Sequence, residues 1–331
     1  MRRLINDPYN IVEEMLAGYV RAFGDKVKLI GEMGRVVVSK NAPKKDKVGI
    51  IIGGGSGHEP LFLGYVGDGF ADAAVIGNIN TSPSPEPCYE AVKAVDAGKG
   101  CVYLYGNYAG DVLNFNMGAE MAAEDGIRVE TVLVTDDVIS AENVEDRRGI
   151  AGDFFVFKAA AAKAELGGDI DEVVAAAKKA NANCATMGVA MGAADHPNTG
   201  GPMFEMEDGD MEIGMGIHGE PGVKREKARS MDEVVTEIAD VLIPELKLKE
   251  GDEVYVLCNS LGATPLMDLM VGFRKLAEIL DSKGIKIYKT LAGTYASTMN
   301  MPGFSFTLLK LDDELKTLMD YPTNAPYFVQ K

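Results

Sequence analysis

The sequence predicts an α/β fold of two domains, each a largely parallel or mixed sheet covered by helices. The chain has 331 residues, more than one domain usually holds. Apolar residues make up 47% and charged residues 25%, which is typical of a globular protein. Short apolar runs alternate with helical patterns, as in βαβ units. Residues 186–222 are rich in Gly, Met and Pro, so we predict domains 1–183 and 184–331.

Three apolar runs in the first half each stop at turn residues, and we predict buried strands there, over 48–52, 101–105 and 130–134. Helical spacing over 112–125 predicts a crossover helix between the last two. An Ala-rich stretch predicts one long helix over 157–182. Ligands in such folds gather beyond the carboxyl ends of the strands, so the loops after these strands are the candidate site.

The second half repeats the alternation of strands and helices. Helical spacing predicts helices over 231–242 and 265–280, and apolar runs predict strands over 253–258, 285–290 and 304–309.

Charge and cysteine content exclude several classes of protein. The net charge is −17, which repels phosphate backbones and anionic lipids, so we expect neither nucleic acid nor a membrane as partner. No apolar run approaches the ~20 residues of a spanning helix, and the N-terminus shows no signal peptide. The four cysteines form no CxxC pair, so we predict reduced thiols in a cytoplasmic protein.

The first candidate motif is Gly53-Gly54-Gly55-Ser56-Gly57-His58-Glu59-Pro60, directly after a predicted strand. Glycines let a backbone approach a ligand and expose its N–H groups. The motif does not match the dinucleotide-binding fingerprint G-x-G-x-x-G, because Pro60 stands where that fingerprint has its third glycine. It is not a P-loop either, because the chain contains no Gly-Lys-Ser/Thr. The structural alternative is a tight turn with an incidental histidine.

The second candidate is His218, in Gly216-Ile217-His218-Gly219-Glu220-Pro221-Gly222. Flanking glycines leave its imidazole accessible as a base, a nucleophile or a metal ligand. A metal site needs three or more ligands, and no cysteine lies near His218 or His58, so we expect no metal. His196, in a polar loop with Pro197, is interpreted as a solvated loop residue.

The third candidate is Asp111, in Asn107-Tyr108-Ala109-Gly110-Asp111 before an apolar helix. It is interpreted as an N-cap, a general base, or both. Three further loops are expected on the same rim: the hydroxyl-bearing turn 81–85, the cations Arg147 and Arg148, and the loop 259–265.

These motifs, in this order from Arg3 to Lys310, resemble the substrate-binding K subunit of dihydroxyacetone kinases. The resemblance implies that His218 bonds covalently to the carbonyl carbon of the ketone, forming a hemiaminal. It implies that His58 and Asp111 flank the hydroxyl that becomes phosphorylated. The implied substrate cradle consists of Gly53, Gly54, Gly55, Ser56, Gly57, Ser82 and Gly106.

The resemblance also implies the partners. The chain has no nucleotide motif, so no cofactor is expected on it; ADP or ATP with Mg is expected on a separate L subunit. A phosphotransferase-system M protein would act indirectly, by rephosphorylating that nucleotide, although an L subunit that uses free ATP is an alternative. A homodimer is implied as well.

Two departures leave the substrate open between dihydroxyacetone and a related ketose. Gly106 stands where the family has a lysine, and Asn78-Ile79-Asn80 replaces an acidic and an aromatic residue. The space gained could admit a four-carbon ketose such as erythrulose. A ketone-sensing co-activator is the alternative from another functional class. The joint presence of His58, Asp111 and His218 favours catalysis.

Overall fold

The computed structural model describes residues 3–331 and divides the chain into two compact units. The predicted single boundary at 183/184 differs from this division, because the chain passes between the units several times. Residues 155–179 and 315–331 belong with the N-terminal part, and residues 135–154 with the other unit. The buried ammonium of Lys158 holds the C-terminal segment there, since it donates to the carbonyl oxygens of Gly69 and Tyr321 at 3.1 and 2.6 Å.

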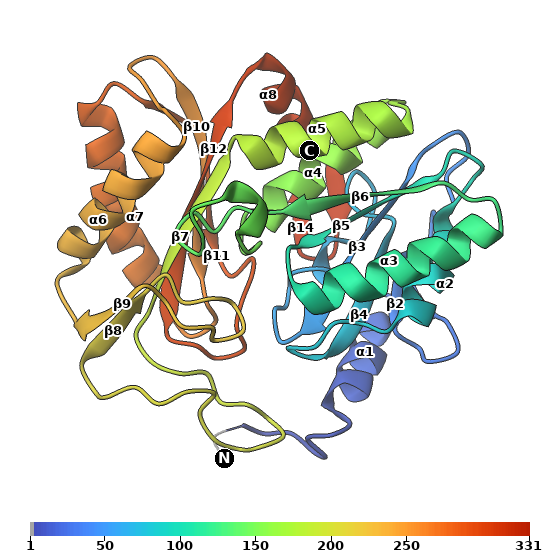
Figure 1. Ribbon diagram of the computed structural model, residues 1–331, viewed down its shortest axis with the longest axis horizontal. Coiled ribbons are helices and arrows are strands. Elements are labelled where there is room, and N and C mark those ends of the chain that lie inside the picture. Colours follow the sequence, from blue (N-terminus) through green and yellow to red (C-terminus); the bar gives the residue numbers. More distant parts are fainter. Residues whose placement is uncertain (1–2) are drawn as a thin grey trace. The chain divides into compact units, whose positions relative to one another are not determined.

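The first unit contains a six-stranded mixed sheet (Figure 1). Its strand order is β1-β2-β4-β3-β5-β6. The strands β4, β3, β5 and β6 are parallel, whereas at one edge β1 pairs antiparallel with β2 and β2 pairs antiparallel with β4. The three strands predicted in this half are confirmed as β3, β5 and β6. The strands are β1 Val27–Ile30, β2 Val36–Ser39, β3 Gly49–Ser56, β4 Ala73–Ile79, β5 Cys101–Gly106 and β6 Val129–Val134.

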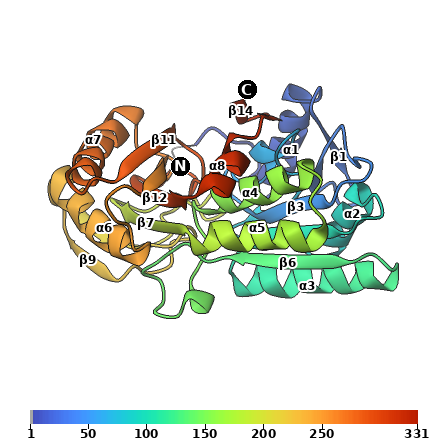
Figure 2. The same ribbon diagram turned by 90° about the horizontal axis from the view of Figure 1, so that it is seen from above.

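Helices cover both faces of this sheet, with α3 on one side and α4 and α5 on the other (Figure 2). The predicted crossover helix is confirmed as α3. In the core beneath it, the Phe115 ring stacks on Tyr105 with ring centroids 4.3 Å apart. The elements are α1 Ile11–Ala22, η1 Leu63–Tyr65, α2 Pro85–Val95, α3 Ala109–Glu124, α4 Asp153–Glu165, α5 Ile170–Ala182, α8 Asp313–Asp320, and the hairpin of β13 Thr323–Ala325 and β14 Phe328–Gln330.

The single long helix predicted over 157–182 is wrong, because the chain breaks between α4 and α5. Gly167 adopts φ +86°, a left-handed conformation that ends a helix. Asp169 and Glu172 then exchange hydrogen bonds between side chains and backbone N–H groups at 2.9 and 3.0 Å, a pattern that starts the next helix.

The second unit contains another six-stranded mixed sheet, in the order β11-β10-β12-β7-β8-β9. Only β10 and β11 pair in parallel; the other neighbours are antiparallel. Every strand and helix predicted in this half is confirmed, whereas β7, β8 and β9 were not predicted. The elements are η2 Val144–Asp146, β7 Cys184–Ala190, β8 Asp210–Ile213, β9 Lys224–Lys227, α6 Met231–Glu245, β10 Glu253–Ser260, α7 Leu266–Ser282, β11 Lys286–Gly293 and β12 Gly303–Leu311.

Within residues 3–331, no helix has both the length and the apolar character needed to cross a membrane.

Candidate functional site

The glycines at the end of β3 are required by close packing of the protein itself. A Cβ at Gly53 would lie 2.6 Å from the Val75 carbonyl oxygen and 2.8 Å from the Phe115 ring. At Gly54 it would lie 2.5 Å from the Phe62 ring, and at Gly55 2.8 Å from the backbone nitrogen of residue 81. The end of β3 therefore packs so closely against its neighbours that only glycine fits at these positions. The sequence analysis did not predict this reason for the glycines.

His58 follows β3 in a loop that is fixed from both sides. Its side chain is buried, and its carbonyl accepts the Leu61 N–H at 3.0 Å. Gly57, at φ +103°, donates its N–H to the Glu59 carboxylate at 3.0 Å. Ser56 donates its hydroxyl to the Gly77 carbonyl at 2.8 Å. The loop therefore holds His58 at the carboxyl edge of the sheet.

Asp111 is the third residue of α3 and not its N-cap, because the helix starts at Ala109 and Tyr108 is the capping position. The expected N-cap role is therefore wrong. The carboxylate is buried in the first helical turn, where the helix dipole favours a negative charge. Burial, reinforced by the Asp111 charge, raises the pKa of Cys88 well above its ordinary value.

Ser82 lies against the first two turns of α3. Asn114 donates to the Ser82 hydroxyl oxygen at 3.2 Å, and a Cβ at Gly110 would lie 3.4 Å from the Ser82 Cβ. The chain just before Ser82 also touches the glycine motif, since the Asn80 N–H donates to the Ser56 carbonyl at 3.0 Å. The glycine motif, Ser82 and the start of α3 therefore meet at one edge of the sheet.

Gly106 is the last residue of β5 at the same carboxyl edge, where it is buried and pairs with Val134 of β6. The first unit thus gathers at one sheet edge the residues that the sequence singled out in it: Gly53, Gly54, Gly55, Ser56, Gly57, His58, Ser82, Gly106 and Asp111.

His218 lies in a loop of the second unit and is held by Glu220. The side chain is 21% exposed. Its Nδ1 lies 3.0 Å from Oε1 of Glu220, and its backbone N–H donates to Oε2 at 2.9 Å. Thr298 fixes the preceding residue by donating its hydroxyl to the Ile217 carbonyl at 2.7 Å. The imidazole therefore has a defined orientation.

The charge of Glu220 sets the tautomer of His218. Burial acts to raise the pKa of Glu220, but the hydrogen bond with His218 and the charge of Arg148 lower it to about 2. An ionised carboxylate only accepts hydrogen bonds, so Nδ1 carries the proton. The neutral ring then has its lone pair at Nε2, the arrangement that a nucleophile needs. Sequence reasoning missed this role of Glu220, although the spacing His-x-Glu was a signal.

The two expected cations diverge. Arg148 contacts Asp137 at 2.8 Å and donates to the Gly214 carbonyl at 3.0 Å. Arg147 instead pairs with Glu245, near the end of α6, at 2.7 Å. The two cations therefore have different partners, and their expected place on a common rim stays a prediction.

The two remaining polar loops have structural contacts. Asn259 is buried, donates to the Ala296 carbonyl at 2.7 Å and accepts the Ala296 N–H at 2.9 Å. It thereby fixes the segment that leads to Thr298. His196 accepts the Asn198 N–H at 3.2 Å within its own loop, which supports its interpretation as a loop residue.

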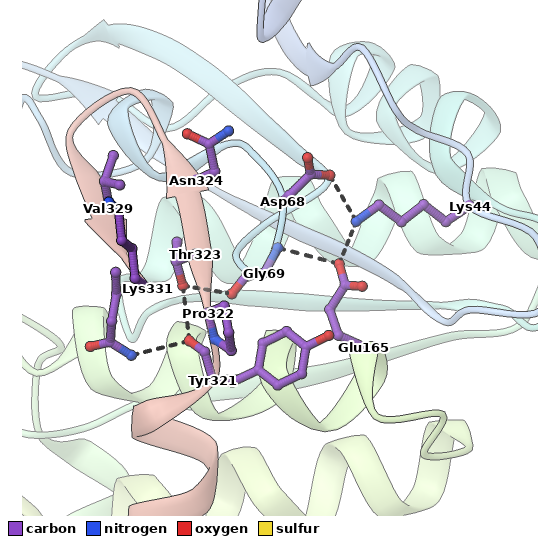
Figure 3. A pocket seen from close by; sticks show the side chains of 11 residues that line it. Lys44, Asp68, Gly69, Glu165, Tyr321, Pro322, Thr323, Asn324, Val329 and Lys331 are labelled. Atoms are coloured by element: carbon purple, nitrogen blue, oxygen red, sulfur yellow. Dashed lines mark hydrogen bonds and ion pairs between the residues drawn. The ribbon is translucent and has the colours of Figure 1, made fainter.

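A separate hollow of about 530 Å³ lies in the first unit beside the C-terminal hairpin (Figure 3). Three of its charged groups pair with one another, since Lys44 lies 2.6 Å from Glu165 and 2.9 Å from Asp68. None of the residues predicted for the site lines it, and we assign it no role. The lining residues are Lys44, Asp68, Gly69, Glu165, Tyr321, Pro322, Thr323, Asn324, Val329, Gln330 and Lys331.

Comparison with known proteins shows the family. The model of the Dak1 domain matches residues 17–327. A Listeria innocua protein named PTS-dependent dihydroxyacetone kinase 2, dihydroxyacetone-binding subunit DhaK, is 63% identical over 99% of both chains. A Mycolicibacterium smegmatis D-erythrulose kinase is 39% identical over 99% of this chain but only 56% of its own.

Solved structures agree. Dihydroxyacetone kinase from C. freundii, in complex with AMP-PNP and Mg²⁺, has a TM-score of 0.90 and 30% identity over 99% of this chain. This chain spans 61% of that longer one. A dihydroxyacetone kinase operon co-activator, also 30% identical, has a TM-score of 0.89 over 96% of this chain and 98% of its own. With a Dak1 match over most of its length, the chain belongs to the Dak1 domain family.

Proposed function

We propose that this chain is the ketone-binding subunit of a dihydroxyacetone-type kinase, which holds a small ketose while phosphate is transferred to its terminal hydroxyl. The observation that carries this proposal is the 63% identity, over nearly all of both chains, to a protein named as such a subunit. The co-activator shares the fold but only 30% identity, so the kinase is favoured over the sensor.

The chemistry of capture follows from the His218–Glu220 pair, 3.0 Å apart. The Nε2 lone pair attacks the carbonyl carbon and forms an N–C bond. The π electrons of the carbonyl move to oxygen, which takes one proton from solvent. The ring becomes positively charged, and the Glu220 carboxylate balances that charge. A small ketone offers few atoms for contact, so a reversible covalent bond adds affinity and excludes glycerol, which has no carbonyl.

The first unit supplies the groups for phosphoryl transfer. Asp111, a buried carboxylate in the first turn of α3, accepts the proton of the attacking hydroxyl, and His58 flanks the same hydroxyl. The cradle for the substrate consists of Gly53, Gly54, Gly55, Ser56, Gly57, Ser82 and Gly106.

The phosphoryl donor is ATP with Mg²⁺ on a separate L subunit. Transfer leaves ADP on that subunit, and a phosphotransferase-system M protein rephosphorylates this ADP. Two relatives support this: the Listeria innocua protein is named as PTS-dependent, and the solved C. freundii enzyme contains AMP-PNP and Mg²⁺. The chain acts in the cytoplasm as a homodimer.

A phosphorylation assay tests the proposal. The chain is mixed with its nucleotide-binding partner and either ATP or the phosphotransferase components, and phosphate transfer to dihydroxyacetone is followed, with glycerol as the control acceptor. We expect transfer to dihydroxyacetone only when both subunits are present. Ketone binding without any transfer would contradict the kinase and support the co-activator.

Gly106 favours a second candidate substrate, a four-carbon ketose such as erythrulose. Asn80, which bonds to the glycine motif, could contact its additional hydroxyl, whereas Asn78 accepts a hydrogen bond from Arg35 at 2.9 Å. The test compares kcat/KM for both ketoses in the wild type and in Gly106→Lys. A wild-type preference of about tenfold or more for dihydroxyacetone that the lysine leaves unaltered would exclude erythrulose.

A further inference from the structure

A row of alternating charges extends from His218 into the second unit. Nδ1 of His218 lies 3.0 Å from Glu220, Glu220 lies 3.9 Å from Nη1 of Arg148, and Arg148 lies 2.8 Å from Asp137. The Arg148 side chain is 16% exposed and that of Asp137 is 1% exposed. The Arg148–Asp137 end of the row is therefore shielded from water, and its charges act on one another more strongly than surface charges do, whereas the Glu220 side chain is 32% exposed.

The position of Arg148 is fixed by contacts on several sides. Its Nη2 donates to the Gly214 carbonyl at 3.0 Å, and its Nε donates to the Asp137 carboxylate at 3.0 Å. Its own carbonyl accepts the Asp137 N–H at 3.0 Å. The neighbouring carboxylate of Asp136 is anchored by the N–H groups of residues 150 and 152. The guanidinium is thus held beside Glu220.

We propose that Arg148 and Asp137 are positioning residues for ketone capture: Asp137 holds the Arg148 guanidinium, and Arg148 orients the Glu220 carboxylate, so that His218 holds its proton at Nδ1 and presents Nε2 to the carbonyl carbon. This inference rests on the proposed covalent role of His218.

The charge of Asp137 affects how strongly Arg148 acts on Glu220 and His218. Burial raises the pKa of Asp137 to about 7, with Arg148 acting against the rise and Asp136 and Glu220 adding to it. Its second oxygen, Oδ1, is buried without a hydrogen-bond partner among residues 3–331. Asp137 therefore changes charge near neutral pH. When it is neutral, the positive charge of Arg148 is less compensated and disfavours a protonated His218 ring.

Two variants should then act in opposite directions. Arg148→Gln keeps a hydrogen-bond donor but removes the cation, which favours the protonated ring. Asp137→Asn keeps the shape but removes the anion, which disfavours it. Arg147→Gln is the matched control, because Arg147 pairs with Glu245 instead. Affinity for dihydroxyacetone is measured by calorimetry over the range in which imidazole titrates, about pH 5–8.

Ketone affinity should fall at low pH, where the His218 ring is protonated, and we call this fall the low-pH limb of the affinity curve. We expect Arg148→Gln to weaken ketone binding roughly tenfold and to move this limb to higher pH. Asp137→Asn should move that limb to lower pH, but by less than Arg148→Gln moves it upward, because Asp137 itself becomes protonated below about pH 7. Arg147→Gln should match the wild type. A merely structural role would shift neither limb, so unshifted limbs, or limbs that move in the same direction, would overturn the inference. Should Arg148→Gln unfold, Arg148→Lys keeps the cation and is expected to keep the limb in place.

A second measurement does not depend on the ketone. The chain has three histidines, so the ¹⁵N spectrum of their ring nitrogens is simple, and His218→Gln assigns the signals. We expect the Nδ1–H tautomer in the wild type and a mixture of tautomers in Arg148→Gln. The same tautomer in both would overturn this inference, whereas a wild type with the Nδ1–H tautomer that binds no ketone would overturn only the proposed function.

Discussion

The two units hold their candidate residues by different physical means. At the edge of the first sheet, backbone packing places the groups: β3 fits against Val75, Phe115 and Phe62 only because Gly53 and Gly54 have no side chain. In the second unit, side-chain charges place His218, through Glu220 and Arg148. The first arrangement depends on the shape of the backbone, whereas the second depends on charge.

The difference separates two kinds of failure. Substitutions of the glycines at the end of β3 should act mainly on the free energy of unfolding, because an added side chain would push β3 away from its neighbours. Substitutions around His218 should act mainly on the protonation state of one ring. Asp111 is the exception in the first unit, because its carboxylate is assigned a proton-transfer role.

The largest effect is expected at Asp111. Asp111→Asn keeps the shape of a side chain in the first turn of α3 but removes the base. With the nucleotide-binding partner supplied, turnover should fall roughly 10²–10⁴-fold while ketone affinity is retained. Steady-state kinetics and calorimetry measure the two quantities. Equal losses of affinity and turnover would show that Asp111 is structural.

A stability effect is expected at Gly53. Gly53→Ala places a Cβ 2.6 Å from the Val75 carbonyl oxygen, and overpacking of this kind costs about 1–3 kcal/mol in the free energy of unfolding. Gly18, exposed in α1 with no atom near its would-be Cβ, is the matched control. Gly18→Ala should stabilise by roughly 0.5–1 kcal/mol. Urea unfolding measures the free energy of unfolding of both variants. If Gly53→Ala leaves this free energy unchanged, close backbone packing does not explain the glycine.

The smallest effect concerns stability against pH. The pKa of Glu220 is lowered to about 2, so its contribution is present above the ordinary value of 4.5 and lost as pH falls toward 2. The pKa of Asp137 is raised from 3.8 to about 7, so the folded chain binds the extra proton and stability declines as pH rises between these values.

Urea unfolding at several pH values reads these two slopes. Glu220→Gln should flatten the acid slope and Asp137→Asn the slope toward neutrality. If neither variant changes its slope, the charges of Glu220 and Asp137 do not determine how the stability of the second unit depends on pH.

Local sequence signals predicted much of this molecule. Apolar runs that end at turn residues located the central strands of the first sheet, and glycine-flanked histidines marked both loops. The break between α4 and α5 had a local signal in Gly167-Gly168-Asp169, which Ala-rich periodicity obscured. The packing of Gly53 against Val75 and the bond from Arg148 to Gly214, 66 residues apart, depend on sheet order and had none.

The most direct test of the central claim is an NMR measurement of dihydroxyacetone labelled with ¹³C at its carbonyl carbon, bound to ¹⁵N-labelled protein. Covalent capture predicts a tetrahedral carbon with a one-bond coupling to a ring nitrogen of His218, absent in His218→Gln. A coupling to Nε2, with Nδ1 still protonated toward Glu220, would support the account in full. Bound ketone whose carbon remains trigonal, or is tetrahedral without coupling to nitrogen, would contradict it.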